Sequence, residues 1–336
     1  MDDDLRDRLA RCEELRQQSL RGDAAVGILS LEELRWMERE LHALAAAGVR
    51  EAWTALARYH LDPGGLAFSV ADAADCASRA VALESVDGRD ELIRVLPAAR
   101  AELEAPPASA AGAQEATLRM IADDPGGRWG YLAGLLAFHG WGRARDVPES
   151  FRLHEAAASR GSPDAMFEVS VLLASGLGVP KDPVASLDWC RRAAEAGHPR
   201  AAYNMGAFHA TGAGVERDEV EARRWYGLAS EAGNARASAT LAVMVSQGSG
   251  GPADEARAAA LLESRRGAGA GRRGAAGGFW GLAGRYPAGP GRVCPRSSRP
   301  RCVHLKETHH DDLDAERLLG GAGGGGSRGV RRHGAG

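Results

Sequence analysis

The sequence predicts an all-α protein, a right-handed α/α solenoid of helix-turn-helix repeats, and three observations support this. Two glycines one residue apart recur every 36 residues, each time followed by an aspartate, in HGWGRARD (139–146), SGLGVPKD (175–182), TGAGVERD (211–218) and QGSGGPAD (247–254). Apolar residues between these marks follow a helical period. Aromatic residues make up only 5% of the 336 residues while Ala and Gly are abundant, which is typical of closely packed helices.

Each repeat is predicted to contain a helix, a glycine turn and a second helix. In the second copy one apolar stripe precedes the turn and another follows it, formed by Ala165, Val169, Leu172 and Leu173 and by Leu187, Trp189, Cys190, Ala193 and Ala194. Gly161, Gly197 and Gly233 are expected to end the second helices in a left-handed conformation. The aspartate after each turn is placed to cap the next helix, and Pro183 suits a first turn.

The same periodicity divides the rest of the chain. Residues 1–47 are expected to form two N-terminal helices, Leu5–Leu20 and Leu31–Ala46, which either cap the solenoid or bind a partner. Residues 48–123 are expected to hold a degenerate repeat, with a second helix near 71–83, a further helix over 89–104 and a linker near 105–114. The clear repeats are assigned to 124–160, 161–196, 197–232 and, in part, 233–264.

Two central segments closely resemble the Sel-like repeat family, which is related to the tetratricopeptide repeat. They are DAMFEVSVLLASGLGVPKDPVASLDWCRRAAEAG and RAAYNMGAFHATGAGVERDEVEARRWYGLASEAG. The family's Leu-Gly, Trp-Tyr and Ala-Ala-x-x-Gly marks correspond to Met205-Gly206, Trp225-Tyr226 and Ala193 to Gly197. Departures are Val169-Ser170, Leu153-His154 and Leu261-Leu262. The resemblance implies a solenoid whose first helices line a concave wall that binds a protein or peptide.

Composition argues against several classes of protein. No apolar run approaches the length of a membrane span, and the acidic N-terminus MDDDLRDRLA is unlike a signal peptide, so a cytoplasmic location is expected. The five cysteines form neither a regular disulfide framework nor a zinc-binding spacing. The net charge of −3 combines −12 before residue 265 with +9 from 265 onward.

Residues 265–336 are a different kind of polypeptide. They are rich in Gly and Arg and lack a sustained apolar period, so we expect a low-complexity, disordered tail or the product of a shifted reading frame. Nucleic acid is an unfavoured partner except through this basic tail, where Phe279, Trp280 and Tyr286 could stack on bases. The segment HLKETHHDD (304–312) could ligate a metal, but its spacing alone is weak evidence.

No residue pattern predicts catalysis or a cofactor. SGLGVPKD resembles the start of a phosphate-binding loop, but the residue equivalent to Lys181 is Arg145, Arg217 or Ala253 in the other copies, so a nucleotide site is excluded. Cys190 is equivalent to Tyr226 and is expected to pack in the core. Relatives credited with β-lactam hydrolysis carry paired cysteines in each repeat, which this chain lacks. We therefore predict a protein that is not an enzyme and has no cofactor or metal.

The candidate site is a partner-binding groove on the first helices. Its predicted residues are Arg128, Tyr131, His139, Asp164, Phe167, Arg200, Tyr203 and Arg236. Arg128, Arg200 and Arg236 recur at repeat spacing, which favours an acidic peptide or protein as partner, although the same residues could simply form salt bridges between repeats. The predicted function is a non-catalytic scaffold or adaptor. The alternatives are a regulatory protein whose repeats position a catalytic partner, or a hydrolase like the β-lactamase-like relatives.

Overall fold

The computed structural model describes residues 3–21, 29–62 and 68–272, and in this part of the chain it contains fourteen helices and no strand. The predicted all-α solenoid is confirmed. The first six helices are α1 (Asp3–Arg21), α2 (Leu31–Ala46), α3 (Arg50–His60), α4 (Val70–Ala82), α5 (Val86–Glu102) and α6 (Ala110–Met120). The other eight are α7 (Arg128–His139), α8 (Val147–Ser159), α9 (Pro163–Ser175), α10 (Pro183–Glu195), α11 (Pro199–Thr211), α12 (Glu219–Glu231), α13 (Ala235–Gln247) and α14 (Glu255–Arg272).

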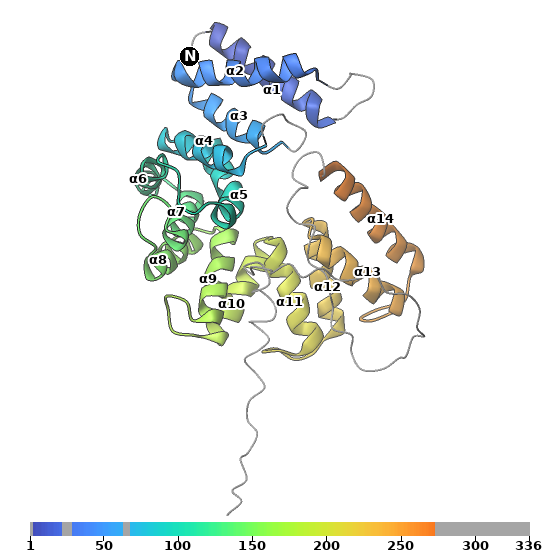
Figure 1. The fold of residues 1–336 in the computed structure, drawn as a ribbon. Helices are drawn as coiled ribbons and strands as arrows, with labels where there is room; N and C mark the ends of the chain where they lie inside the picture. The colour runs from blue at the N-terminus through green and yellow to red at the C-terminus, as the bar shows by residue number, and fades with distance from the viewer. Residues whose placement is uncertain (1–2, 22–28, 63–67, 273–336) are drawn as a thin grey trace, which may run out of the picture.

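The helices form an arc (Figure 1), with α1 and α2 at one end and α13 and α14 at the other. Most helices pack on the next one in the chain, and extensive contacts join α3 to α4, α4 to α5, α7 to α8, α9 to α10 and α11 to α12. The first helices of successive pairs also touch, from α3 through α5 and α7 to α9. The view places α5 and α9 toward the inside of the arc and α6 and α8 at its outer edge. None of the helices described is long and apolar enough to span a membrane.

The repeated turns have the predicted caps. Gly176 ends α9 in the left-handed region, with φ of 70°, and its N–H donates to the carbonyl of Leu172. The Asp182 carboxylate then accepts hydrogen bonds from the N–H groups of Val184 and Ala185, at 3.1 and 2.9 Å. These bonds satisfy groups that the start of α10 leaves without helical partners. The turn is therefore a helix hairpin, as the sequence predicts.

The second glycine of two of these turns, Gly142 and Gly178, also allows a close contact between repeats. A Cβ on Gly178 would lie 2.7 Å from the backbone of Val147, at the start of α8 in the preceding repeat. A Cβ on Gly142 would lie 2.4 Å from the carbonyl oxygen of Ala110, at the start of α6. The turn of one repeat thus packs on the first residue of the preceding second helix, and at these positions there is no room for a side chain.

Two boundaries differ from the sequence-based expectation. The linker predicted near 105–114 is partly helical, because α6 begins at Ala110 and packs on α4 with Ala113 and Thr117 buried. Helix α6 also packs on α7, the first helix of the next repeat. At the other end, α14 continues to Arg272, past the predicted boundary at 264, because the helix runs through the Arg and Ala residues that follow. The tail predictions of disorder, a shifted frame, nucleic-acid binding and a metal site otherwise fall on residues 273–336, outside the described residues.

Glu84 occupies a turn position where other repeats have glycine. It lies 36 residues after Gly48 and adopts φ of 59°, the left-handed region, whereas Gly48, Gly161, Gly197 and Gly233 hold the equivalent φ values between 86° and 93°. A side chain in this region costs about 1 kcal/mol. The Glu84 carboxylate meets Arg119 at 3.4 Å, and both side chains are about half exposed, so this pair contributes little.

Glu84→Gly is expected to raise the free energy of unfolding by about 1 kcal/mol, because glycine adopts this conformation without strain. Denaturant titration followed by circular dichroism measures the change. Glu84→Ala is the control, since it removes the Arg119 contact and keeps the strain. Equal stability of the glycine and alanine variants would contradict the interpretation.

Candidate functional site

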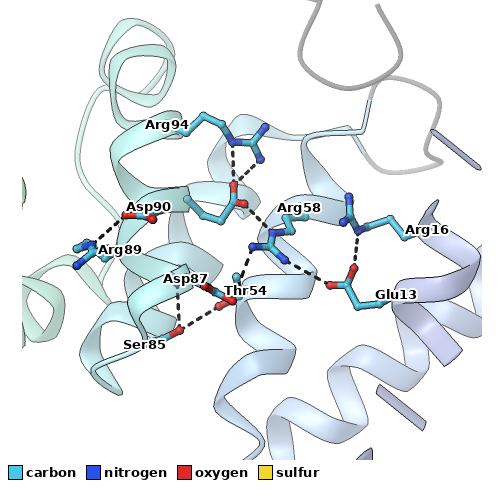
Figure 2. A network of polar contacts seen from close by, with 11 residues as sticks. Glu13, Arg16, Thr54, Arg58, Ser85, Asp87, Arg89, Asp90 and Arg94 are labelled. Atoms are coloured by element: carbon cyan, nitrogen blue, oxygen red, sulfur yellow. Dashed lines mark hydrogen bonds and ion pairs between the residues drawn. The ribbon is translucent and has the colours of Figure 1, made fainter. Parts of the chain in front are cut away.

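Charged side chains connect the first helices at the N-terminal end of the arc (Figure 2). Arg58 on α3 donates from Nε to Glu91 on α5 at 2.6 Å and approaches Glu13 on α1 at 3.7 Å. Arg94 donates from Nε to the other oxygen of Glu91 at 2.8 Å. All four side chains are less than half exposed. They stabilise the alignment of α1, α3 and α5 rather than presenting free charges.

Ion pairs between neighbouring first helices are also found among the predicted groove residues. Arg128 at the start of α7 contacts Asp90 on α5 at 3.0 Å and Asp164 on α9 at 3.8 Å. Asp164 also lies 3.6 Å from Nε2 of His198, the residue that caps α11. Arg128 and Asp164 thus form contacts between repeats, which is the simpler of the two readings that the sequence left open for them.

Phe167 is buried, although the sequence placed it on the groove surface. Only 2% of its area is exposed. The His198 ring stacks on it with centroids 4.4 Å apart and an angle of 20°, and the Arg200 guanidinium lies 5.1 Å from its centroid. The helix cap of the next repeat covers the ring, and burial therefore lowers the pKa of His198 to about 4. Phe167 and His198 are buried in this stack, and the Arg200 side chain is its exposed member.

Glu168 is a residue of this surface that the sequence analysis missed. It is half-buried on α9, four residues after Asp164 and hence on the same helix face. Burial raises the pKa of both carboxyl groups, and burial also raises the pKa of Tyr131 on α7, with smaller contributions from the charges of Glu168 and Asp164. The i, i+4 spacing from Asp164 is the signal that could have identified it.

The remaining predicted residues lie on the same set of helices. His139 at the end of α7 is half-buried against Phe138, with ring centroids 5.1 Å apart. Tyr203 on α11 is half-buried 5.4 Å from the ring of Tyr226. Arg236 is exposed in the first turn of α13. The structure therefore brings Arg128, Asp164, Phe167 and Arg200 into one connected surface through His198. His139, Tyr203 and Arg236 lie on α7, α11 and α13, first helices of the same series.

Cys190 is not placed to act as a nucleophile. Burial raises the pKa of the Cys190 thiol to about 12, so it stays protonated at neutral pH, and its Sγ lies 3.8 Å from the carbonyl oxygen of Ala201. Cys190 is fully buried, as the repeat register predicted. Within residues 3–21, 29–62 and 68–272 no group of His, Cys, Asp or Glu side chains could hold a metal ion.

Helix pairs stacked along an arc, with a polar face on the first helices, define an α/α repeat protein. The Sel1 repeat family matches residues 131–162, 163–198, 199–234 and 235–264. Residues 131–264 therefore consist of four Sel1 repeats, as the resemblance to Sel-like repeats indicated. Proteins built from Sel1 repeats generally mediate protein–protein interactions. Among curated proteins, no match is found.

Several solved structures are similar to this chain at low identity. A Sel1 repeat protein from Oxalobacter formigenes is 23% identical, with a TM-score of 0.43, over 69% of this chain and 82% of that one. The protective antigen c5321 of uropathogenic Escherichia coli, which displays an SLR fold, is 20% identical with a TM-score of 0.44, over 78% of this chain and 57% of that one. The immunity protein Pa5087 of Pseudomonas aeruginosa is 19% identical with a TM-score of 0.45, over 65% and 81%.

Proposed function

We propose that this protein is a non-catalytic scaffold or adaptor that binds a partner protein or peptide along the first helices of its repeats. The observation that carries the proposal is the polar surface formed jointly by α5, α7, α9 and α11, where Arg128, Asp164 and Arg200 lie on three successive repeats. A surface shared by rigid repeats can hold a partner in a defined orientation without any conformational change.

A cytoplasmic location, with a partner encountered there, is part of this proposal. Cys12, Cys76 and Cys190 are free and buried, and burial raises the pKa of each thiol to about 11 or 12. Such thiols need no oxidising compartment, since they contribute to the core as small apolar groups.

Affinity purification of the full chain followed by mass spectrometry tests the proposal. Arg200→Glu combined with Arg236→Glu is expected to abolish capture of the partner without lowering helical content, because both exposed guanidinium groups lie on first helices. Arg191→Glu combined with Arg224→Glu is the matched control, since these exposed arginines lie on second helices. Partner capture that survives the first pair of changes would remove this face from the proposal.

A further inference from the structure

A pocket of about 530 Å³ lies between α6 and the turn that follows α7. Gln114 and Leu118 from α6 and Gly142 and Arg143 from the turn line its wall. Ligand pockets in proteins commonly have this size. Helix α6 is at the outer edge of the arc (Figure 1), and none of the residues predicted for the groove lines this pocket. It is therefore a second candidate site, separate from the groove.

A polar pair lines this pocket where the central repeats have an apolar pair. An added Cβ on Gly142 would lie 3.0 Å from Cβ of Gln114, the fifth residue of α6, and one on Gly214 would lie 3.5 Å from Leu187, the fifth residue of α10. The residue after the turn glycine is Arg143 at the α6 junction. In the two central repeats the residues at these two positions are apolar and partly buried against the core: Phe151 and Val179, and Leu187 and Val215.

Gln114 has no partner for its buried amide. The residue is 3% exposed, and its Oε1 accepts no hydrogen bond within the described part of the chain. Leaving a buried acceptor without a donor is costly, and such groups are normally paired. Arg223, the fifth residue of α12, instead donates to the carbonyl oxygens of Ser249 and Pro252 in its own facing turn, at 3.4 and 3.1 Å. A donor entering the pocket would supply what Gln114 lacks.

Arg143 supplies the uncompensated charge of the pocket. It is exposed and forms no ion pair within the ranges described. The other charged residues of the wall are already compensated, because Arg119 contacts Glu115 at 3.0 Å and Glu84 at 3.4 Å. Leu118 is half-buried and adds an apolar part to the wall. A guanidinium group binds a carboxylate through two parallel hydrogen bonds, so the pocket favours a carboxylate as ligand.

We propose that this pocket binds the C-terminal end of a partner polypeptide. The terminal carboxylate pairs with Arg143, the N–H of the last peptide bond donates to Oε1 of Gln114, and the last side chain packs on Leu118. A chain end carries the carboxylate and the N–H on one residue, and these are the two groups that Arg143 and Gln114 lack. This goes beyond the proposed function, because it adds a site outside the groove on the first helices.

Binding of a short probe peptide to the full-length protein tests this inference. Gly-Ser-Ala-Leu, labelled with fluorescein at its N-terminus and ending in a free carboxylate, is expected to bind saturably, measured by fluorescence anisotropy. The same peptide with a C-terminal amide should bind about tenfold more weakly, since it lacks the charge. Gly-Ser-Ala-Glu with a C-terminal amide should be equally weak, because its carboxylate is on a side chain. No saturable binding of the free-acid peptide, or equal binding of either amide, would overturn the proposal.

Two variants assign the roles of the pocket residues. Arg143→Gln should weaken binding of the free-acid peptide about tenfold and leave binding of the amide within about twofold. Gln114→Leu should weaken free-acid binding about fivefold, because it removes the acceptor for the N–H. Arg217→Gln is the control, since Arg217 is an exposed arginine in the turn after α11, and it should leave binding unchanged.

Stability separates this role of Gln114 from a structural one. Gln114→Leu is expected to raise the melting temperature, because it removes the unpaired acceptor and introduces the residue that α10 has at the same position, Leu187. A lower melting temperature together with unchanged peptide binding would show that Gln114 only supports the fold, and the proposal would fail.

The groove variants distinguish this inference from the proposed function. Arg200→Glu with Arg236→Glu should leave binding of the free-acid peptide unchanged, because neither arginine lines the pocket. If these changes abolish peptide binding, the peptide occupies the groove and the inference falls. If they leave the natural partner bound while Arg143→Gln still weakens peptide binding, the groove proposal falls and the pocket stands.

Discussion

Gly178→Ala is expected to lower the free energy of unfolding by about 3 kcal/mol or more. Two costs combine. With φ of 72°, a non-glycine residue costs about 1 kcal/mol. The added Cβ would also lie 2.7 Å from the carbonyl group of Val147 and 2.8 Å from the nitrogen of Pro148. Because the obstruction is backbone at the start of α8, it is removed only if neighbouring repeats move apart.

Gly214→Ala is the matched control for this prediction. Gly214 occupies the same turn position in the next repeat with φ of 75°, but the nearest atom to its added Cβ is the Cδ2 atom of Leu187 at 3.5 Å. It should cost only about 1 kcal/mol, so the difference between the two variants isolates the contact between repeats. Denaturant titration measures both. If the two alanine variants lose the same stability, the second glycine is needed only for its backbone conformation.

Local features of the repeats were predictable from the sequence. The glycine conformations, the aspartate caps and the ends of the central helices depend on residues only a few positions apart, and the 36-residue register displays them four times. The equivalence of Cys190 with Tyr226 correctly predicted burial for the same reason. Features that depend on contacts between repeats were not predictable in this way. The close approach of Gly178 to Val147 is one such feature.

The parts that the sequence analysis missed have identifiable causes. Helix α6 begins inside an Ala- and Gly-rich segment after two prolines, which is typical of a linker. Its buried residues Ala110, Ala113, Gln114 and Thr117 nevertheless follow helical spacing. Phe167 was placed on the surface by analogy with tetratricopeptide helices, but the cap residue His198 belongs to the following repeat and covers it. Burial by the next repeat cannot be read from the residues of one repeat alone.

Acidification is expected to destabilise the protein through His154. This side chain is 1% exposed, burial lowers its pKa from 6.5 to about 3, and its Nδ1 has no hydrogen-bond partner among the residues described. A histidine whose pKa is lower in the folded state binds fewer protons than in the unfolded chain. Its contribution to stability is therefore fully present above pH 6.5 and is lost as the pH falls toward 3. At pH 4.5 the loss is about 3 kcal/mol relative to neutral pH.

His154→Tyr should remove most of this loss, because it replaces a titrating ring with the residue that the repeat register supplies. His154 and Tyr226 occupy equivalent positions, and each packs its ring against a glycine of the preceding helix, Gly134 or Gly206, at 2.5 and 2.8 Å from the position of an added Cβ. His198, with a pKa lowered to about 4, contributes to acid sensitivity in the same direction. His198→Asn preserves a capping side chain like that of Asn234. Urea titrations between pH 7 and 4.5 should show a smaller loss in each single variant and the smallest loss in the double variant. A double variant as acid-sensitive as the wild type would instead place the effect in other side chains and contradict the assignment to these two buried histidines.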